Sequence, residues 1–279
     1  MKLSAYTKLK AHISLAIALI VVALVLSPLV WAAMTSLRPL TEITTASPTL
    51  LPQNITFDAY RDLWQEAPFA HYCANSVIVA ASTTLLALGF SLTAAYAFAR
   101  FNFKGGRILI VLVVMSQMLP GSSILIPIFR LVRTLGLIDT RTGLILIHTG
   151  FAIPFCVWLL VGYLRSIPRE LDEAALIDGC SHLQLMYRIL LPVIAPAVIA
   201  VGTFGFLLSW NEFLFAYVLG RDEAVTLPVA LRNTFLTQYV NKYDQLFAAS
   251  LIFSVPPIAI FAAMQRYFVR GLTMGAVKE

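Results

Sequence analysis

Six long apolar runs without a single charged residue constrain the fold of this chain more than any other feature. A helix needs about 20 residues to cross the roughly 30 Å hydrocarbon core of a bilayer, and each run is at least that long. An open sheet would leave backbone groups unpaired in lipid, so the runs predict six transmembrane helices in an all-α integral membrane protein. The runs are Ile13–Met34, Tyr72–Phe98, Ile108–Phe129, Thr142–Leu164, Ile189–Asn211 and Gln245–Met264.

The charged residues predict an orientation. Only 12% of the residues are charged, about half the share of an ordinary soluble chain. With the N-terminus inside, 12 of the 20 Lys and Arg residues lie on the inner side, which predicts cytoplasmic N- and C-termini in a multi-pass protein of the cell (inner) membrane. The net charge of +6 then reflects membrane topology and contact with lipid, and it indicates no nucleic-acid partner.

The first apolar run could instead be a signal peptide, because Lys2, Lys8 and Lys10 precede it and the small residues Ala32 and Ala33 follow. Its length exceeds the roughly 7–15 residues of a secretory apolar region, so we expect it to be retained as a helix. The resulting organisation is a cytoplasmic tail over 1–12, a first transmembrane helix over 13–34, an outer loop over 35–71, a five-helix core over 72–268 that includes a cytoplasmic loop over 165–188, and a cytoplasmic tail over 269–279.

The cytoplasmic loop over 165–188 predicts two short helices. The first should begin near Ser166 or Ile167, carry acidic residues at the positive end of its dipole and end at Gly179. The second should begin at Ser181, where Gln184 three residues later completes a capping-box pattern.

Both predicted loop helices have an apolar face. On the second, Leu183, Met186, Tyr187 and Leu190 recur at helical spacing and need a cover of protein or lipid. On the first, Leu171, Ala174 and Ala175 share a low face suited to a protein partner. The alternative is an amphipathic helix lying in the lipid headgroups, but such a helix favours Lys and Arg, and this one is acidic.

These residues resemble the EAA signature of ABC importer permeases, which consists here of Glu173-Ala174-Ala175, Asp178-Gly179, Ile189, Leu191-Pro192 and Pro196. The resemblance implies a coupling helix that sits in a cleft of a cytoplasmic ATPase subunit, with Gly179 as the turn residue. Cys180 and Tyr187 replace the Ala and Phe that are frequent in the family, and both keep size or apolar character. The implied ATPase-coupling residues are Glu173, Ala174, Ala175, Asp178, Gly179, Leu191 and Pro192.

The resemblance extends over nearly the whole chain. Six helices, Trp210-Asn211-Glu212-Phe213 and the C-terminal Gly271–Lys278 are similar to the smaller, second permease of maltose-type carbohydrate importers. This implies the type I ABC importer permease fold, a second homologous permease, two cytoplasmic ATPase subunits and an extracytoplasmic solute-binding protein. It also implies that the tail, with Gly275 and Lys278, reaches the ATPase; Glu279 stands where Gly is commoner.

Polar groups within the spans are candidates for the translocation pathway, because such groups are avoided in lipid unless they face a cavity. Ser116 and Gln117 lie beside a Pro-Gly pair, which predicts either a polar recess or a structural kink. His148 lies deep in a span, where it either acts in the pathway or forms a hydrogen bond between helices. Near the outer boundary the candidates are Trp210, Asn211 and Glu212.

The alternatives to an ABC importer are an ion-coupled secondary transporter and a membrane-embedded enzyme. The first would normally show a repeated half and a buried carboxylate pair, and the second a convergent catalytic group, and the sequence contains neither pattern. Scattered His and Cys residues predict no metal site or disulfide framework, and no phosphate-binding Gly-rich loop is present. We therefore expect no cofactor and ATP hydrolysis by separate subunits.

Overall fold

The computed structural model describes residues 2–45, 49, 51–66, 68–235 and 242–276, and these residues form helices and no strand. The α-helices are α1 (Lys2–Ser36), α2 (Leu40–Ile43), α3 (Asp58–Glu66), α4 (Phe69–Arg100), α5 (Gly106–Met115), α6 (Gly121–Thr134), α7 (Arg141–Arg165), α8 (Glu170–Ile177), α9 (His182–Gln184), α10 (Leu191–Val193), α11 (Ala195–Trp210), α12 (Leu214–Leu219), α13 (Leu227–Phe235) and α14 (Tyr243–Ala276). A 3₁₀ turn, η1 (Ser116–Met118), and a π-helical turn, η2 (Leu185–Leu190), complete them.

The chain divides into two compact units. The first comprises residues 1–68 and 231–254, and the second comprises residues 69–230 and 255–279. In the first unit the end of α1 is tied to α3 by a 2.8 Å hydrogen bond between the hydroxyls of Ser36 and Tyr60. The Glu42 carboxylate accepts bonds from the backbone N–H groups of Gln53 and Asn54 and so closes the loop after α2.

Four of the six predicted spans are single long helices. Helices long and apolar enough to cross a membrane cover Lys10–Ser36, Phe69–Arg100, Arg141–Arg165 and Tyr243–Gln265.

The other two predicted spans are sharply bent, and only the bend in the third span was among the alternatives that the sequence offered. The third breaks between Gly106–Met118 and Gly121–Thr134 at 98°, and the fifth breaks between His182–Val193 and Ala195–Trp210 at 84°. Pro120 explains the first break, because proline removes a backbone donor and clashes with the preceding turn. In the second, Pro192 and Pro196 flank the bend.

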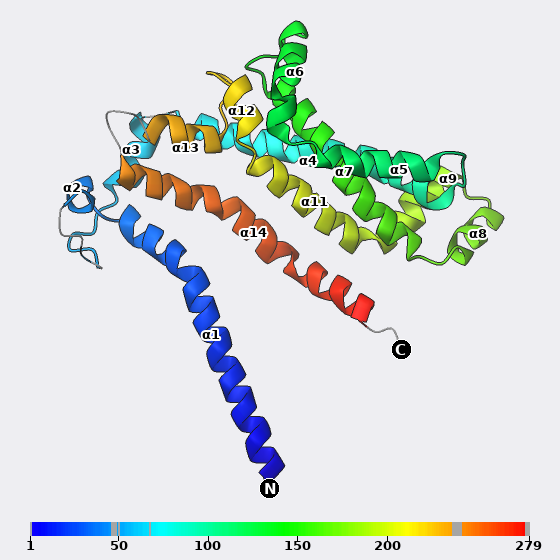
Figure 1. Cartoon of the computed structure of the whole chain (residues 1–279), viewed down its shortest axis with the longest axis horizontal. Coiled ribbons are helices and arrows are strands. Elements are labelled where there is room, and N and C mark those ends of the chain that lie inside the picture. The colour runs from blue at the N-terminus through cyan, green and yellow to red at the C-terminus, as the bar shows by residue number, and fades with distance from the viewer. Residues whose placement is uncertain (1, 46–48, 50, 67, 236–241, 277–279) are drawn as a thin grey trace. The chain divides into compact units, whose positions relative to one another are not determined.

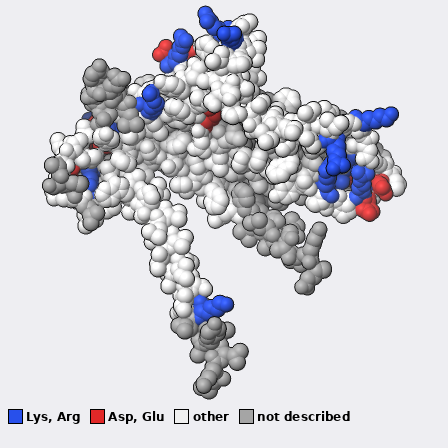
Figure 2. Space-filling model, in the orientation of Figure 1, with Lys and Arg blue, Asp and Glu red and all other residues white. Residues whose placement is uncertain are grey.

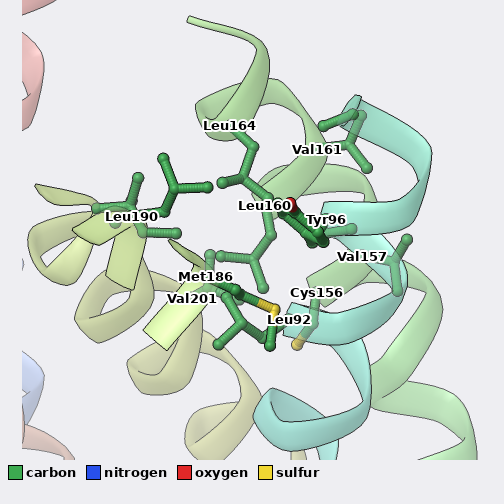
Figure 3. Close-up of a cluster of buried hydrophobic side chains, with 14 of the residues drawn as sticks. Leu92, Tyr96, Cys156, Val157, Leu160, Val161, Leu164, Met186, Leu190 and Val201 are labelled. Carbon is green, nitrogen blue, oxygen red and sulfur yellow. The ribbon is translucent and has the colours of Figure 1, made fainter. Parts of the chain in front are cut away.

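The core of the second unit forms where α4, α7 and α11 pack together (Figure 1). Figure 3 shows the interior of this bundle, in which Leu160 and Leu164 of α7 meet Leu190 and Val201 from the segment that follows the loop. Small residues let the helices approach closely. At Gly202 of α11 an added Cβ would lie only 2.9 Å from Leu88 of α4.

The two ends of this bundle carry different structures. At one end α7 leads into α8 and α9, and at the other lie α6 and α12 (Figure 1). The predicted coupling loop and the predicted outer pathway residues therefore occupy opposite ends of α7.

Candidate functional site

The loop helix α8 begins later than the sequence predicts. It spans Glu170–Ile177, whereas the prediction placed its start near Ser166 or Ile167. The backbone N–H groups of those two residues instead bond to the last turn of α7, at Tyr163 and Leu164. Ser166 and Ile167 therefore belong to the turn that ends α7. The acidic residues lie in the first turn of α8, where their negative charge interacts favourably with the positive end of the helix dipole.

Gly179 ends α8, as predicted. Its φ of +84° lies in the left-handed region, which costs other residue types about 1–2 kcal/mol. Its N–H donates to the Leu176 carbonyl at 3.1 Å, and the N–H of Cys180 donates to the Ala175 carbonyl at 3.0 Å. This pair of bonds is the Schellman motif, which satisfies carbonyls at a helix end. An added Cβ at Gly179 meets no atom within 4 Å. Within this chain, glycine is therefore favoured by the positive φ of the backbone and not by a lack of space.

The second loop helix starts with the predicted capping box. The Gln184 N–H donates to Ser181 Oγ at 3.3 Å, and the Ser181 N–H donates to Gln184 Oε1 at 2.9 Å. These bonds satisfy two backbone donors that a helix start would otherwise leave unpaired.

The apolar face predicted after this cap is buried in part, at Met186 and Leu190. Leu183 and Tyr187 are exposed, whereas Leu185, Met186 and Leu190 are at most 2% exposed. The reason is the π-helical turn η2, which has more residues per turn and so shifts the buried side of the helix away from the 3.6-residue register.

The shared face predicted for α8 is correct for Leu171 and Ala174 and wrong for Ala175. Ala175 is buried in the apolar core, while Ala174 is exposed on another side of the helix. Leu171 is 37% exposed and Ile177 is 85% exposed, so they lie with Ala174 on the free side. Leu171, Ala174 and Ile177 are each three residues apart, and this spacing, rather than a spacing of four, connects the exposed residues.

An ion pair that sequence reasoning missed fixes α8 to the end of α4. Arg100 Nε lies 2.6 Å from Asp172 Oδ2, at an angle outside hydrogen-bond geometry. The two side chains are 6% and 12% exposed, and Arg100 Nη1 also donates to the Ile167 carbonyl at 3.2 Å. Arg100 Nη2 and Asp172 Oδ1 have no hydrogen-bond partner among the described residues. The sequence predicted the acidic residues of this helix only as dipole partners, and no local spacing links Asp172 to Arg100.

The remaining predicted coupling residues differ in how exposed their side chains are. Glu173 and Asp178 are exposed on α8. Leu191 and Pro192 form α10 at the start of the bent fifth span, where Leu191 packs against the apolar core and Pro192 is exposed.

Midway along α7, the predicted pathway residues Ser116 and Gln117 lie in η1, just before the 98° bend. The Ser116 hydroxyl donates to its own helix at the Val113 carbonyl, at 2.7 Å. Gln117 Nε2 donates to the Phe151 carbonyl of α7 at 2.8 Å and so ties η1 to that helix. The structural kink is therefore present, and Gln117 holds it.

His148 connects three elements, in accord with the interhelical alternative. Its Nδ1 lies 2.7 Å from Ser209 Oγ and its Nε2 lies 3.1 Å from Glu212 Oε2. Glu212 also accepts the backbone N–H groups of Phe215 and Ala216, at the start of α12. A Ser-His-Glu set has the residue types of a hydrolase triad, but here Ser209 is 5% exposed and so closed to a substrate. The set is a buried hydrogen-bond network, and no sequence pattern pointed to Ser209.

The other two outer candidates make contacts along their own helix. Trp210 is 2% exposed and stacks on Phe206 with ring centroids 5.5 Å apart. Asn211 is exposed and donates to the Leu207 carbonyl of its own helix. Among the predicted pathway residues, the structure therefore brings His148 and Glu212 together.

A second cluster at the α12 end of the bundle holds the loop between α12 and α13. Asp139 accepts hydrogen bonds from four successive backbone N–H groups, those of residues 221–224, at 2.8–3.2 Å. Burial alone would raise the pKa of this carboxyl, but the four bonds outweigh it and hold the pKa below its ordinary value. Asp139 itself has a φ of 57°, a left-handed conformation that aspartate tolerates.

The carbonyl groups of the same loop are held from α4. Asn75 Nδ2 donates to the carbonyls of Glu223 and Val225, both at 2.8 Å, and Asn75 Oδ1 accepts from Arg141 Nε at 2.6 Å. Sequence reasoning missed both Asn75 and Asp139, since their partners lie far along the chain. The predicted tail residue Lys278 lies outside the described residues, and the surroundings of Gly275 are not described either.

Comparison with known proteins gives a consistent set of matches. Residues 86–274 match the family described as binding-protein-dependent transport system inner membrane component. The diacetylchitobiose uptake system permease protein DasC of Streptomyces coelicolor is 33% identical over 252 residues, which cover 90% of this chain and 91% of DasC. The trehalose transport system permease protein SugB of Mycobacterium tuberculosis is 34% identical over 261 residues, which cover 93% and 94%.

A solved structure agrees with these relatives. One chain of a bacterial ABC transporter involved in the import of the acidic polysaccharide alginate superposes with a TM-score of 0.81. It is 26% identical, and the superposition covers 94% of this chain and 97% of that chain.

Proposed function

This chain belongs to the family of binding-protein-dependent transport system inner membrane components, and we propose that it is the smaller, second permease of a heterodimeric sugar importer. It is the permease subunit of an ABC importer in the inner membrane, and it is not an enzyme, because separate ATPase subunits hydrolyse ATP. The sugar assignment rests on relatives that are named for diacetylchitobiose and trehalose and on the solved alginate importer.

The observation that carries the coupling proposal is the construction of α8. One side of this short helix is fixed to the membrane bundle through buried Ala175 and the Arg100–Asp172 pair. Its other side exposes apolar Leu171 and Ile177. A helix with one anchored and one free apolar side can receive a partner and pass that partner's motion to the bundle.

We therefore assign α8 and its Gly179 turn to the contact with a cytoplasmic ATPase subunit. When the two ATPases bind ATP and close, α8 moves with them and the permease pair opens towards the other side of the membrane. The solute arrives from an extracytoplasmic binding protein, consistent with the family's description. This scheme places the N- and C-termini in the cytoplasm.

Substitution of Gly179 tests the assignment. Gly179→Asp places a charge where the ATPase is proposed to dock, and an unpaired charge buried at an interface costs about 2 kcal/mol or more. This corresponds to a loss of roughly 30-fold in ATPase affinity. We expect that uptake of the cognate sugar is abolished and that the ATPase no longer copurifies, while the permease still inserts in the membrane.

Two controls separate charge from backbone strain. Gly179→Asn has nearly the same shape and also tolerates positive φ, so it should retain more ATPase than Gly179→Asp. Gly136→Asp introduces the same charge at another glycine with positive φ and open space, at the end of α6, and it should leave copurification unchanged. Normal uptake by Gly179→Asp would exclude this coupling site.

A further inference from the structure

An apolar groove of about 400 Å³ runs between α5 and α7. Its walls include Val111 and Val114 of α5 and Trp158 of α7, and Gly162 leaves one wall without a side chain. Most of these residues are exposed although they are large and apolar, as expected for a surface that meets hydrocarbon rather than water. The groove therefore has the lining that an acyl chain requires.

A basic hollow of about 670 Å³ adjoins the groove. The two hollows share Ile110 and Arg165 in their walls, so they lie next to each other. The second one adds the cationic side chains of Lys104 and Arg107, beside Phe101 and Phe103. Figure 2 shows Lys and Arg side chains gathered at this end of the molecule, which carries α5 and α8.

The three cations face this hollow without a counter-charge. Among the described residues, no ion pair involves Lys104, Arg107 or Arg165, although Arg165 Nη2 donates to the Phe98 carbonyl. The carboxylates of α8 lie at the same end, but no acidic residue lines either hollow. A cluster of this kind beside an apolar groove on membrane-spanning helices is complementary to a lipid phosphate.

We propose that the groove and its basic mouth bind one anionic phospholipid. An acyl chain lies between α5 and α7, and the phosphate contacts Lys104, Arg107 and Arg165. The apolar extension favours a lipid over a free phosphate ion, which would use only the basic end. That the lipid belongs to the cytoplasmic leaflet rests on the orientation proposed above, whereas the site itself does not.

Native mass spectrometry of the purified, assembled transporter tests the headgroup contact. The complex is titrated with phosphatidylglycerol or phosphatidylcholine of equal chain length, without sugar or ATP. One basic residue near an anionic lipid surface is worth about fivefold in binding. Lys104→Gln/Arg107→Gln should therefore weaken phosphatidylglycerol binding roughly 30-fold. Arg130→Gln/Arg133→Gln, an equal loss of exposed charge on α6, should leave it unchanged.

A second pair of variants tests the chain contact. An added Cβ meets no atom within 4 Å at either Gly162 or Gly150 of α7, so the two positions are matched sites for introducing a side chain. Gly162→Leu fills the groove and should weaken binding of both lipids on the order of tenfold. Gly150→Leu lies outside the groove and should not.

Five results would overturn the proposal. Equal binding of the two lipids excludes headgroup selection, and unchanged phosphatidylglycerol binding by Lys104→Gln/Arg107→Gln excludes the basic mouth. Unchanged binding by Gly162→Leu excludes the groove. Displacement of the lipid by inorganic phosphate identifies a free-anion site. Loss of the partner permease from the Gly162→Leu complex assigns the groove to a protein helix. Since lipid binding is read without transport, it succeeds or fails independently of the proposed function.

Discussion

The buried pair between Arg100 and Asp172 makes a strong prediction about how firmly α8 is held. Asp172→Asn keeps the shape of the side chain but leaves the Arg100 guanidinium buried without its counter-charge. Removing one partner of a buried ion pair costs about 3–5 kcal/mol. The two side chains are only 6% and 12% exposed, so solvent screens this cost little.

The chain offers a natural reporter of this cost. Cys180 directly follows the turn that ends α8, is partly buried and packs against the apolar core. If α8 detaches, its thiol becomes open to a maleimide. A loss of about 3 kcal/mol raises the detached population on the order of 100-fold. In a Cys73→Ser/Cys156→Ala background, the alkylation rate of Cys180 in membranes without the ATPase should rise by that factor.

The double variant provides the control. Arg100→Gln/Asp172→Asn removes both charges and leaves no isolated ion, so its alkylation rate should lie below that of either single variant. Additive effects of the two substitutions would show that the pair has no interaction energy. Unchanged rates in both single variants would refute the argument that the pair holds α8.

Three further predictions concern local hydrogen bonds. Asp139→Asn keeps the left-handed backbone but halves the carboxylate acceptors, so the loop over 220–225 should lose about 1.5–3 kcal/mol of stability and become open to protease. In the parent protein the stabilisation of this loop by Asp139 is complete above the ordinary pKa of 3.8 and is lost as the pH falls through the lowered folded pKa. The variant should lack that pH dependence. Glu212→Gln and His148→Gln should each lower the thermal midpoint of the purified complex, with less than additive effects in combination, because they share one network; additive effects would contradict the network. Ser181→Ala removes one capping-box bond and should cost about 1 kcal/mol, read as faster alkylation of Cys180; an unchanged rate would show that the cap does not hold the loop.

The features that the sequence predicted well are local. Ser181 and Gln184 are three residues apart, and a helix that reaches Gly179 needs a residue tolerant of positive φ, so both ends of the loop could be read from neighbouring residues. Apolar length likewise predicted the spans. The Pro-Gly pair at Pro120 predicted a weakened helix, although not an angle of 98°.

What the sequence could not predict depends on distant partners or on a change in the number of residues per helical turn. Arg100 and Asp172 meet only because α4 and α8 meet at one end of the bundle, and no spacing rule connects them. Asp139 similarly holds a loop more than 80 residues away. The π-helical turn moved the buried face of the segment after Ser181, because hydrophobic periodicity assumes 3.6 residues per turn.

Helix α4 is the element that both ends of the second unit share. At its start Asn75 holds the loop after α12 and accepts from Arg141 of α7, and at its end Arg100 holds α8. Between these points α4 packs against α7, whereas the third and fifth spans are broken. A motion imposed on α8 is therefore expected to move α4 and α7 as one body and to be absorbed at the two bends, since packed helices resist deformation more than interrupted ones. Weakening the Arg100–Asp172 pair should then reduce coupling without disturbing the Asn75 contacts at the opposite end.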